Sequence, residues 1–135
     1  NVMYMKTIFG AALVIGLIGA AGSALAGQRW NYPVSINETS RYAVGAMADV
    51  RGTSDYNQVI GCWNNAGPTP AAGCLAINSA GLTKSCFTYN TTVIDAIRTV
   101  STDSYIYFQW NTDGTCAYVY IDNNSRFKSA KTSGD

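Results

Sequence analysis

Apolar and polar residues alternate along most of the chain in short runs, and clusters of glycine, proline, asparagine and aspartate separate these runs. Such alternation is typical of half-buried strands bounded by turns. We predict a short first strand at 33–36 and further strands at 40–50, 56–63, 72–78, 82–89, 104–110 and 115–122. Six or seven short strands predict a mainly β fold, either a small antiparallel β-sandwich or an open barrel.

One segment, NTTVIDAIRTVS at 90–101, departs from this alternation. Its apolar residues recur at the helical spacing i, i+3, i+4, i+7, and they are Val93, Ala96, Ile97 and Val100. We therefore predict one short helix at about 91–101, with Asn90 or Thr91 as N-cap and Asp95 as an early helix charge. A helix of about three turns is unstable alone and must dock on a sheet. The β-branched residues leave a strand as the alternative.

The last two strands are predicted to form a hairpin around Asp113-Gly114, a type I′ turn sequence. This turn would pair three residues of one strand with three of the other in an apolar core face made of Ile106, Phe108, Trp110, Ala117, Val119 and Ile121. A four-residue loop over 111–114 is the alternative, and it would shift the partners but keep the same two faces.

The opposite side of this hairpin is the candidate binding face, and its residues are Tyr105, Tyr107, Gln109, Tyr118 and Tyr120. Cys116 has the parity of Tyr118, so its disulfide should reach into whatever covers that end of the face. Two interpretations stay open. The helix or a neighbouring strand packs on the tyrosines, or the tyrosines face solvent and bind a sugar ring, a peptide or a second copy of the chain.

The four cysteines, Cys62, Cys74, Cys86 and Cys116, predict two disulfides. No CxxC motif and no histidine occur, so we expect no metal site. A three-residue turn at 79–81, with Gly81 in the left-handed conformation, would place Cys74 opposite Cys86. Four cysteines allow three pairings, among which we favour Cys62–Cys74 with Cys86–Cys116.

The N-terminal region has the three parts of a bacterial secretory signal peptide, which we predict at 5–26 after four upstream residues. Lys6 is followed by an apolar run and by Ala24-Leu25-Ala26, a small-x-small cleavage pattern. A membrane-spanning helix is the alternative. Cleavage would leave one exported domain at 27–135, periplasmic or extracellular, with a flexible basic tail from about 126.

Composition argues against most enzymes. Without Lys6, eight basic and eight acidic residues remain, so we expect neither nucleic acid nor, after signal cleavage, a membrane as partner. Lack of histidine excludes Ser-His-Asp and Cys-His centres. The aspartates at 49, 55, 95, 103, 113 and 122 each fit a structural role better than a catalytic one, so we assign no catalytic residue and no cofactor.

These features favour a secreted, non-enzymatic domain that binds a glycan or a cell-surface protein through the aromatic face. The alternative is an extracellular structural component that self-assembles through strand edges or the aromatic face. An enzyme or an enzyme inhibitor comes third.

Three segments also resemble small exported bacterial proteins of unassigned function. They are IGC at 60–62, DSYIYFQW at 103–110 and GTCAYVYIDNNS at 114–125. The resemblance covers most of the exported part and implies a single exported domain. It implies no activity and no site residue.

Overall fold

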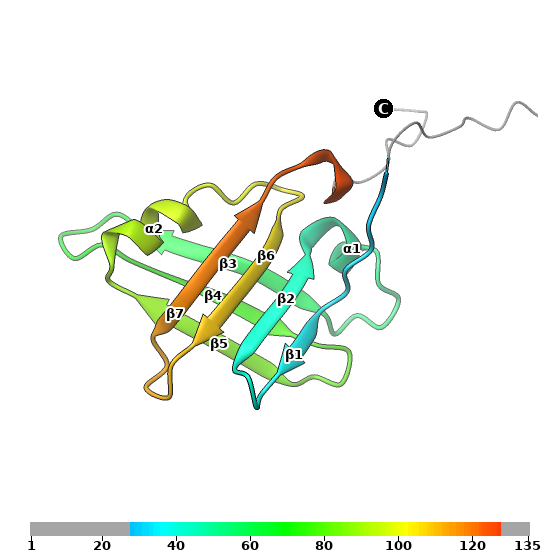
Figure 1. The fold of residues 1–135 in the computed structure, drawn as a ribbon, viewed down its shortest axis with the longest axis horizontal. Coiled ribbons are helices and arrows are strands. Elements are labelled where there is room, and N and C mark those ends of the chain that lie inside the picture. Colours follow the sequence, from blue (N-terminus) through cyan, green and yellow to red (C-terminus); the bar gives the residue numbers. More distant parts are fainter. Residues whose placement is uncertain (1–27, 128–135) are drawn as a thin grey trace, which may run out of the picture.

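Two antiparallel sheets face each other in the computed structural model, which describes residues 28–127 (Figure 1). The four-stranded sheet has the order β1-β2-β6-β7, and its strands are β1 Ser35–Asn37, β2 Tyr42–Ala46, β6 Tyr105–Trp110 and β7 Cys116–Asp122. The three-stranded sheet has the order β3-β4-β5, and its strands are β3 Val59–Asn65, β4 Ala71–Ile77 and β5 Thr83–Thr88. The predicted mainly β fold with one main helix and two disulfides is confirmed.

Two separate parts of the chain form the four-stranded sheet. It forms β1 and β2, passes through helix α1 (Met47–Arg51) into the three-stranded sheet, and returns through helix α2 (Thr91–Ile97) to β6 and β7. Strand β6 then pairs with β2 and with β7. The strands of the two sheets cross one another in Figure 1, and α2 contacts β7, β3 and β4, so that it joins the two sheets on the β7 side.

The core lies between the sheets and combines large side chains on one sheet with small ones on the other. Ile106 and Phe108 of β6 are fully buried against Ala72, Cys74 and Ala76 of β4. Small residues also allow a close approach at β2: a Cβ on Gly45 would lie 3.2 Å from the side chain of Ile60. Shape matching of this kind sets the separation of the sheets.

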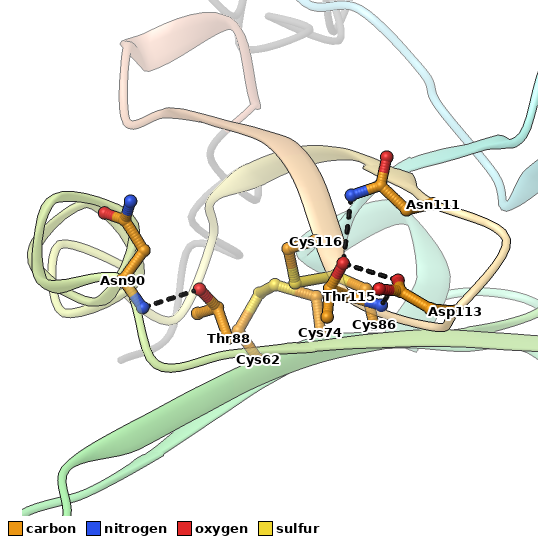
Figure 2. Close-up of a disulfide and its surroundings, with 9 residues drawn as sticks. All are labelled: Cys62, Cys74, Cys86, Thr88, Asn90, Asn111, Asp113, Thr115 and Cys116. Atoms are coloured by element: carbon orange, nitrogen blue, oxygen red, sulfur yellow. Dashed lines mark hydrogen bonds between the residues drawn. A yellow bond between two sulfur atoms is a disulfide. The ribbon is translucent and has the colours of Figure 1, made fainter.

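The two disulfides form one cluster in this core (Figure 2). Cys74 on the central strand β4 lies opposite Cys62 of β3 and also opposite Cys86 of β5. Cys74 bonds to Cys62 within the sheet, whereas Cys86 bonds to Cys116 on β7 of the other sheet. The favoured pairing is therefore confirmed, and one of the two bridges ties the sheets together.

The turn at 78–82 confirms the predicted register of β4 and β5. Gly81 has a φ of 81°, the left-handed conformation that glycine adopts without steric cost. The carboxamide oxygen of Asn78 accepts hydrogen bonds from the backbone N–H groups of Ala80 and Leu82. This geometry sets Cys74 opposite Cys86.

The β6–β7 turn corrects part of the predicted hairpin. Phe108 pairs with Val119 and Ile106 with Ile121, as predicted, but Trp110 pairs with Cys116 and not with Ala117. The loop spans 111–114, closed by a hydrogen bond from Asn111 N–H to the Thr115 carbonyl, and a β-bulge adds Ala117 to β7. The extra residue reverses the parity of the strand. Cys116 thus packs against the core instead of the tyrosine side, and Ala117 is exposed.

The segment predicted as a strand at 40–50 is a strand only as far as Ala46. It continues as helix α1, in which Asp49 is buried. The Asp49 carboxylate accepts hydrogen bonds from the Arg29 guanidinium at 2.7 Å and from the Tyr32 backbone N–H at 2.9 Å. These partners come from a distant part of the sequence, so the local alternation gave no sign of the helix.

Helix α2 confirms the predicted helix and excludes a strand there. The Asn90 side chain caps it by accepting from the N–H groups of Thr92 and Val93. The helix ends at Ile97, four residues before the predicted end at 101, and Ile94 is buried beside Ile97. Asp95 is not in the first turn; it lies on the exposed side and pairs with Arg98 at 3.1 Å.

The predicted signal peptide and most of the predicted tail lie outside the described residues. A 3-10 turn, η1 (Ser125–Phe127), lies at the start of the predicted tail, and Phe127 is buried against the domain. Within residues 28–127, no helix has the length and apolar character needed to cross a membrane.

We predict that the disulfide between the sheets contributes more stability than the one within the sheet. Cys86–Cys116 closes a 30-residue separation and Cys62–Cys74 a 12-residue separation, so removing each pair by double replacement with alanine should cost about 3.5 and about 3 kcal/mol, respectively. Denaturant titration of both variants measures the difference. A larger loss for the Cys62–Cys74 variant would contradict the prediction. Labelling of the unreduced wild type by a thiol reagent would reveal free thiols and would also contradict it.

Candidate functional site

The candidate site is the side of the four-stranded sheet that points away from the core. The register places Tyr107 opposite Tyr120 and Gln109 opposite Tyr118, and strand alternation places Tyr105 on the same side. All five predicted residues thus share one surface. Strand β2 adds Tyr42, which pairs with Gln109. We call this surface the tyrosine face, made of Tyr42, Tyr105, Tyr107, Gln109, Tyr118 and Tyr120.

The rings of the tyrosine face contact one another across three strands. Tyr42 stacks on Tyr107 with ring centroids 5.4 Å apart, and Tyr107 meets Tyr118 edge to face at 6.0 Å. Tyr105 meets Tyr120 in the same way at 6.3 Å. Offset stacked and edge-to-face pairs at these distances are favourable. The contacts restrain the rings and give the strip a defined shape before any ligand binds.

One end of the face is covered by the chain itself. Phe127 of η1 stacks on Tyr105 at 4.8 Å, and Tyr32 contacts Tyr105 edge to face at 5.1 Å. Trp30 packs on Phe127, and the Arg126 guanidinium lies 4.0 Å from the Trp30 ring centroid. The N-terminal segment and η1 therefore form an aromatic cap over Tyr105, and this end of the face is packed.

Buried Asp49 holds that cap in place. It binds both the Arg29 side chain and the Tyr32 backbone, and its own side chain is almost fully buried. A buried carboxylate is tolerated only when its oxygens are paired and hydrogen bonded, as they are here. Asp49 is thus a structural anchor for the segment that carries Trp30 and Tyr32.

The other end of the face is open. Tyr118 is 50% exposed and Tyr120 is 45% exposed. Polar groups lie beside the rings: the Gln109 amide donates to the Tyr107 hydroxyl at 2.8 Å, and the Tyr120 hydroxyl donates to Asp122 at 3.3 Å. Tyr105 is packed by η1 and the N-terminal segment, and not by the helix or a neighbouring strand as one interpretation predicted, whereas Tyr118 and Tyr120 face solvent.

Two phenols of the face, those of Tyr105 and Tyr120, have a raised pKa. Burial raises the pKa of Tyr105, helped by the nearby phenol of Tyr32. The carboxylate of Asp122 raises the pKa of Tyr120. A neutral phenol both donates and accepts hydrogen bonds, whereas a phenolate only accepts. The open end thus offers apolar ring faces, hydroxyls and the Gln109 amide. The Asp122 carboxylate pairs in register with Tyr105 at the packed end and accepts from the Tyr120 hydroxyl.

Asp113, Asp55 and Asp103 each accept hydrogen bonds from neighbouring groups. Asp113 accepts from the backbone and hydroxyl of Thr115 in the β6–β7 loop (Figure 2), which lowers the pKa of Asp113. Hydrogen bonds from Gln58 and Asn57 lower the pKa of Asp55. Asp103 pairs with Arg51. Within residues 28–127, no three metal-ligating side chains gather into a site.

A shallow hollow beside α1 is a weaker candidate. It has a volume of about 250 Å³ and is lined mainly by apolar side chains of α1 and the start of β3, namely Met47, Val50, Val59 and Ile60, with Arg51 and Gln58. This volume falls below the range of roughly 300–1,000 Å³ that is usual for small-molecule pockets. The tyrosine face has more hydrogen-bonding groups.

The sequence pattern did not indicate Tyr42 or the aromatic cap. Tyr42 lies in a predicted strand, but its place on the tyrosine face depends on pairing between β2 and β6, and 58 residues separate these two strands. The only signal was strand alternation: Tyr42 is next to Ala43, a core residue, and adjacent residues of a strand point to opposite sides. Trp30, Tyr32 and Phe127 lie outside every predicted strand, and no local pattern indicated that they pack together.

Comparison with known proteins gives no relative: the chain matches no protein-family model, no curated protein and no solved structure. The resemblance to small exported bacterial proteins therefore stays a prediction.

We predict that the loss of stability on truncating a tyrosine to alanine decreases along the tyrosine face, from its packed end to its open end. Phe108→Ala in the core should cost about 3–5 kcal/mol. Tyr105→Ala should cost about 2–3 kcal/mol because it removes contacts with Phe127 and Tyr32. Tyr118→Ala should cost about 1 kcal/mol or less because the side chain is half exposed. Chemical denaturation gives all three values, and equal losses at Tyr105 and Tyr118 would show that the open end is also packed.

We predict that Asp122→Asn lowers the pKa of Tyr120 towards the ordinary tyrosine value of about 10. In the wild type the folded-state pKa is raised, so the stability contributed by Tyr120 is present below its unfolded pKa and is lost as pH rises through the folded pKa. Spectrophotometric titration of tyrosinate should show one group ionising earlier in the variant. Asp95→Asn on α2 is the control, and superimposable titrations of wild type and Asp122→Asn would contradict the prediction.

Proposed function

We propose that this protein is an exported, non-enzymatic binding domain whose tyrosine face binds a glycan. Export is proposed on the signal-peptide pattern at 5–26 together with two disulfides, which are compatible with an oxidising compartment. Binding is proposed on one observation: half-exposed tyrosines lie beside hydrogen-bonding groups on a rigid sheet. The two parts are separable, since the face would bind the same ligand wherever the protein resides.

The chemistry of the open end suits a sugar ring. A pyranose has apolar C–H faces and a rim of hydroxyls, so it needs a flat aromatic surface and neighbouring polar groups that can both donate and accept. Tyr118 and Tyr120 supply exposed rings, and Gln109 and Asp122 supply an amide and a carboxylate. Binding sites of this type combine aromatic lining with a few placed polar groups.

The rigidity of the face supports binding over a purely structural role for its rings. Tyr107 is held between Tyr42 and Tyr118, and its hydroxyl accepts from Gln109. Restrained side chains lose less conformational entropy when a ligand binds. The entropy lost on binding is therefore mainly that of the ligand, and this favours stiff polysaccharides over flexible partners.

A non-enzymatic role is supported by the contacts of the acidic residues. Asp49 is buried under Arg29 and the Tyr32 backbone, and Asp113 is a turn residue. Asp122 is the acidic residue paired in register with the tyrosine face, and it is bound to Tyr120 and Asn124. A glycosidase needs two carboxylates flanking one bond, and the face supplies one.

We predict that the protein sediments with at least one of three insoluble polysaccharides: purified peptidoglycan, chitin or cellulose. Tyr118→Ala and Tyr107→Ala should each weaken this binding by at least about tenfold, since truncating an aromatic anchor costs more than about 1.4 kcal/mol. Tyr56→Ala is the matched control because Tyr56 is 98% exposed and lies in the loop before β3, outside the sheet faces.

Two results would contradict glycan binding. One is failure to bind any of the three polysaccharides, and the other is unchanged binding by Tyr118→Ala. Whole bacterial cells distinguish a glycan from a surface protein: an excess of the polysaccharide that binds should compete with the cells for the protein, and protease treatment of the cells should leave attachment unchanged. Attachment that survives this competition but is lost after protease treatment would assign the face to a surface protein instead.

A further inference from the structure

The three-stranded sheet places Cys74 between two other cysteines. Cys74 is on the central strand β4, directly opposite Cys62 on one side and directly opposite Cys86 on the other. All three side chains pack in the core between the sheets, where the two bridges lie together (Figure 2). Cys74 therefore has two neighbours that it can bond to, and the native structure uses one of them.

A bond between Cys74 and Cys86 fits the geometry of the sheet. Residues directly opposite in an antiparallel pair have Cα atoms about 4.5–5.5 Å apart. Disulfides join Cα atoms at separations of about 4.4–6.8 Å, so this pair is within reach. Cys62 lies two strands from Cys86, at about twice the strand spacing of roughly 4.8 Å, which is too far for a bridge. Cys74 is thus the cysteine through which the two bridges can exchange.

Each bridge joins a partly exposed cysteine to a buried one. Cys62 and Cys116 are partly exposed, whereas Cys74 and Cys86 are almost fully buried. A thiolate from solution therefore reaches the outer sulfur of a bridge, and the buried partner becomes the leaving thiolate. An apolar core disfavours that charge because it removes the charge from water. Attack on the neighbouring bridge moves the charge to the other partly exposed cysteine, where water solvates it.

We infer that the two disulfides form a redox switch, in which a dithiol reduces either bridge and leaves the same product. In that product Cys74 is bonded to Cys86, and the two outer cysteines are thiols. When the dithiol attacks Cys62, the bond to Cys74 breaks and a mixed disulfide forms at Cys62. The Cys74 thiolate attacks the Cys86 sulfur, and the bond to Cys116 breaks. The second thiol of the reagent then displaces Cys62. The reagent ends as a disulfide, having passed two electrons to the protein, and its two protons end on Cys62 and Cys116.

The switch changes which elements are cross-linked. Cys86–Cys116 ties the two sheets together in the oxidised protein, whereas a Cys74–Cys86 bridge lies within the three-stranded sheet. In the product, β5 and the loop before β7 are joined by noncovalent contacts, such as the hydrogen bond from Phe87 N–H to the Gly114 carbonyl. Partial reduction therefore releases the start of β7, the strand of the exposed tyrosines, while the three-stranded sheet stays cross-linked. The inference does not depend on glycan binding.

Limited reduction of the wild type tests the switch. The folded protein is treated with less than one equivalent of dithiothreitol, free thiols are blocked with N-ethylmaleimide, and the remaining bridges are mapped by mass spectrometry of peptides. The main species with one bridge should contain Cys74–Cys86 and carry the label on Cys62 and Cys116. If instead the remaining bridge is mainly Cys62–Cys74 or Cys86–Cys116, one bridge is simply lost without exchange, and the inference is overturned.

Two variants separate local exchange from scrambling in an unfolded chain. Cys62→Ala leaves Cys74 as a thiol opposite Cys86, so the Cys74–Cys86 bridge should form without any reductant and leave Cys116 as the free thiol. Its rate should rise about tenfold per pH unit while the thiol is mostly protonated, because only the thiolate attacks. Cys74→Ala is the matched control, since its free Cys62 lies two strands from Cys86 and should leave Cys86–Cys116 intact.

Two results with these variants would overturn the inference. One is a Cys62→Ala protein that keeps Cys86–Cys116 as its single bridge at alkaline pH. The other is a Cys74→Ala protein in which Cys62 enters a bridge as fast as Cys74 does in Cys62→Ala, which would show that the exchange needs no particular register.

Discussion

The disulfide between Cys86 and Cys116 is the constraint on which the rest of the structure depends. It is the covalent bond between the two sheets, and it joins β5 to the start of β7 next to the β6–β7 loop (Figure 2). The backbone supports the same junction, since Phe87 N–H donates to the Gly114 carbonyl. A domain of this size buries little apolar surface, so a cross-link between its layers forms a large part of its stability.

Placing Cys116 towards the core also determines where the tyrosines point. The β-bulge at Ala117 reverses the strand parity between Cys116 and Tyr118, so one strand sends its cysteine inward and its tyrosines outward. Without the bulge, a cysteine and two tyrosines at alternate positions would share one side. The bulge therefore lets a single short strand supply both the bridge between the sheets and the exposed rings.

The two outer surfaces of the sandwich have separate chemistries. The tyrosine face combines phenols with an amide and a carboxylate, and the aromatic cap packs one of its ends. On the outer side of the three-stranded sheet, Trp63 and Phe87 are exposed and no strand residue on that side carries a charge. A sandwich with two sheets has two such outer sides, and here neither is covered by another layer of the described chain.

The sequence by itself determined most of the strands, helix α2 and the number of disulfides, because these follow from local spacing and from the cysteine count. Period-two alternation located the strands, and the i, i+3, i+4 spacing located α2. The turn at Gly81 set the register that places Cys74 opposite Cys86. Alternation within β6 and β7 also assigned all five predicted residues to one face. Only the tertiary structure decided which residues surround that face and which segments cover it. Helix α1, the cap of Phe127 over Tyr105, the place of Tyr42 and the alignment of Trp63 with Phe87 all depend on contacts between segments distant in the sequence. Such contacts are set by packing and by the register of non-adjacent strands, which no local pattern encodes.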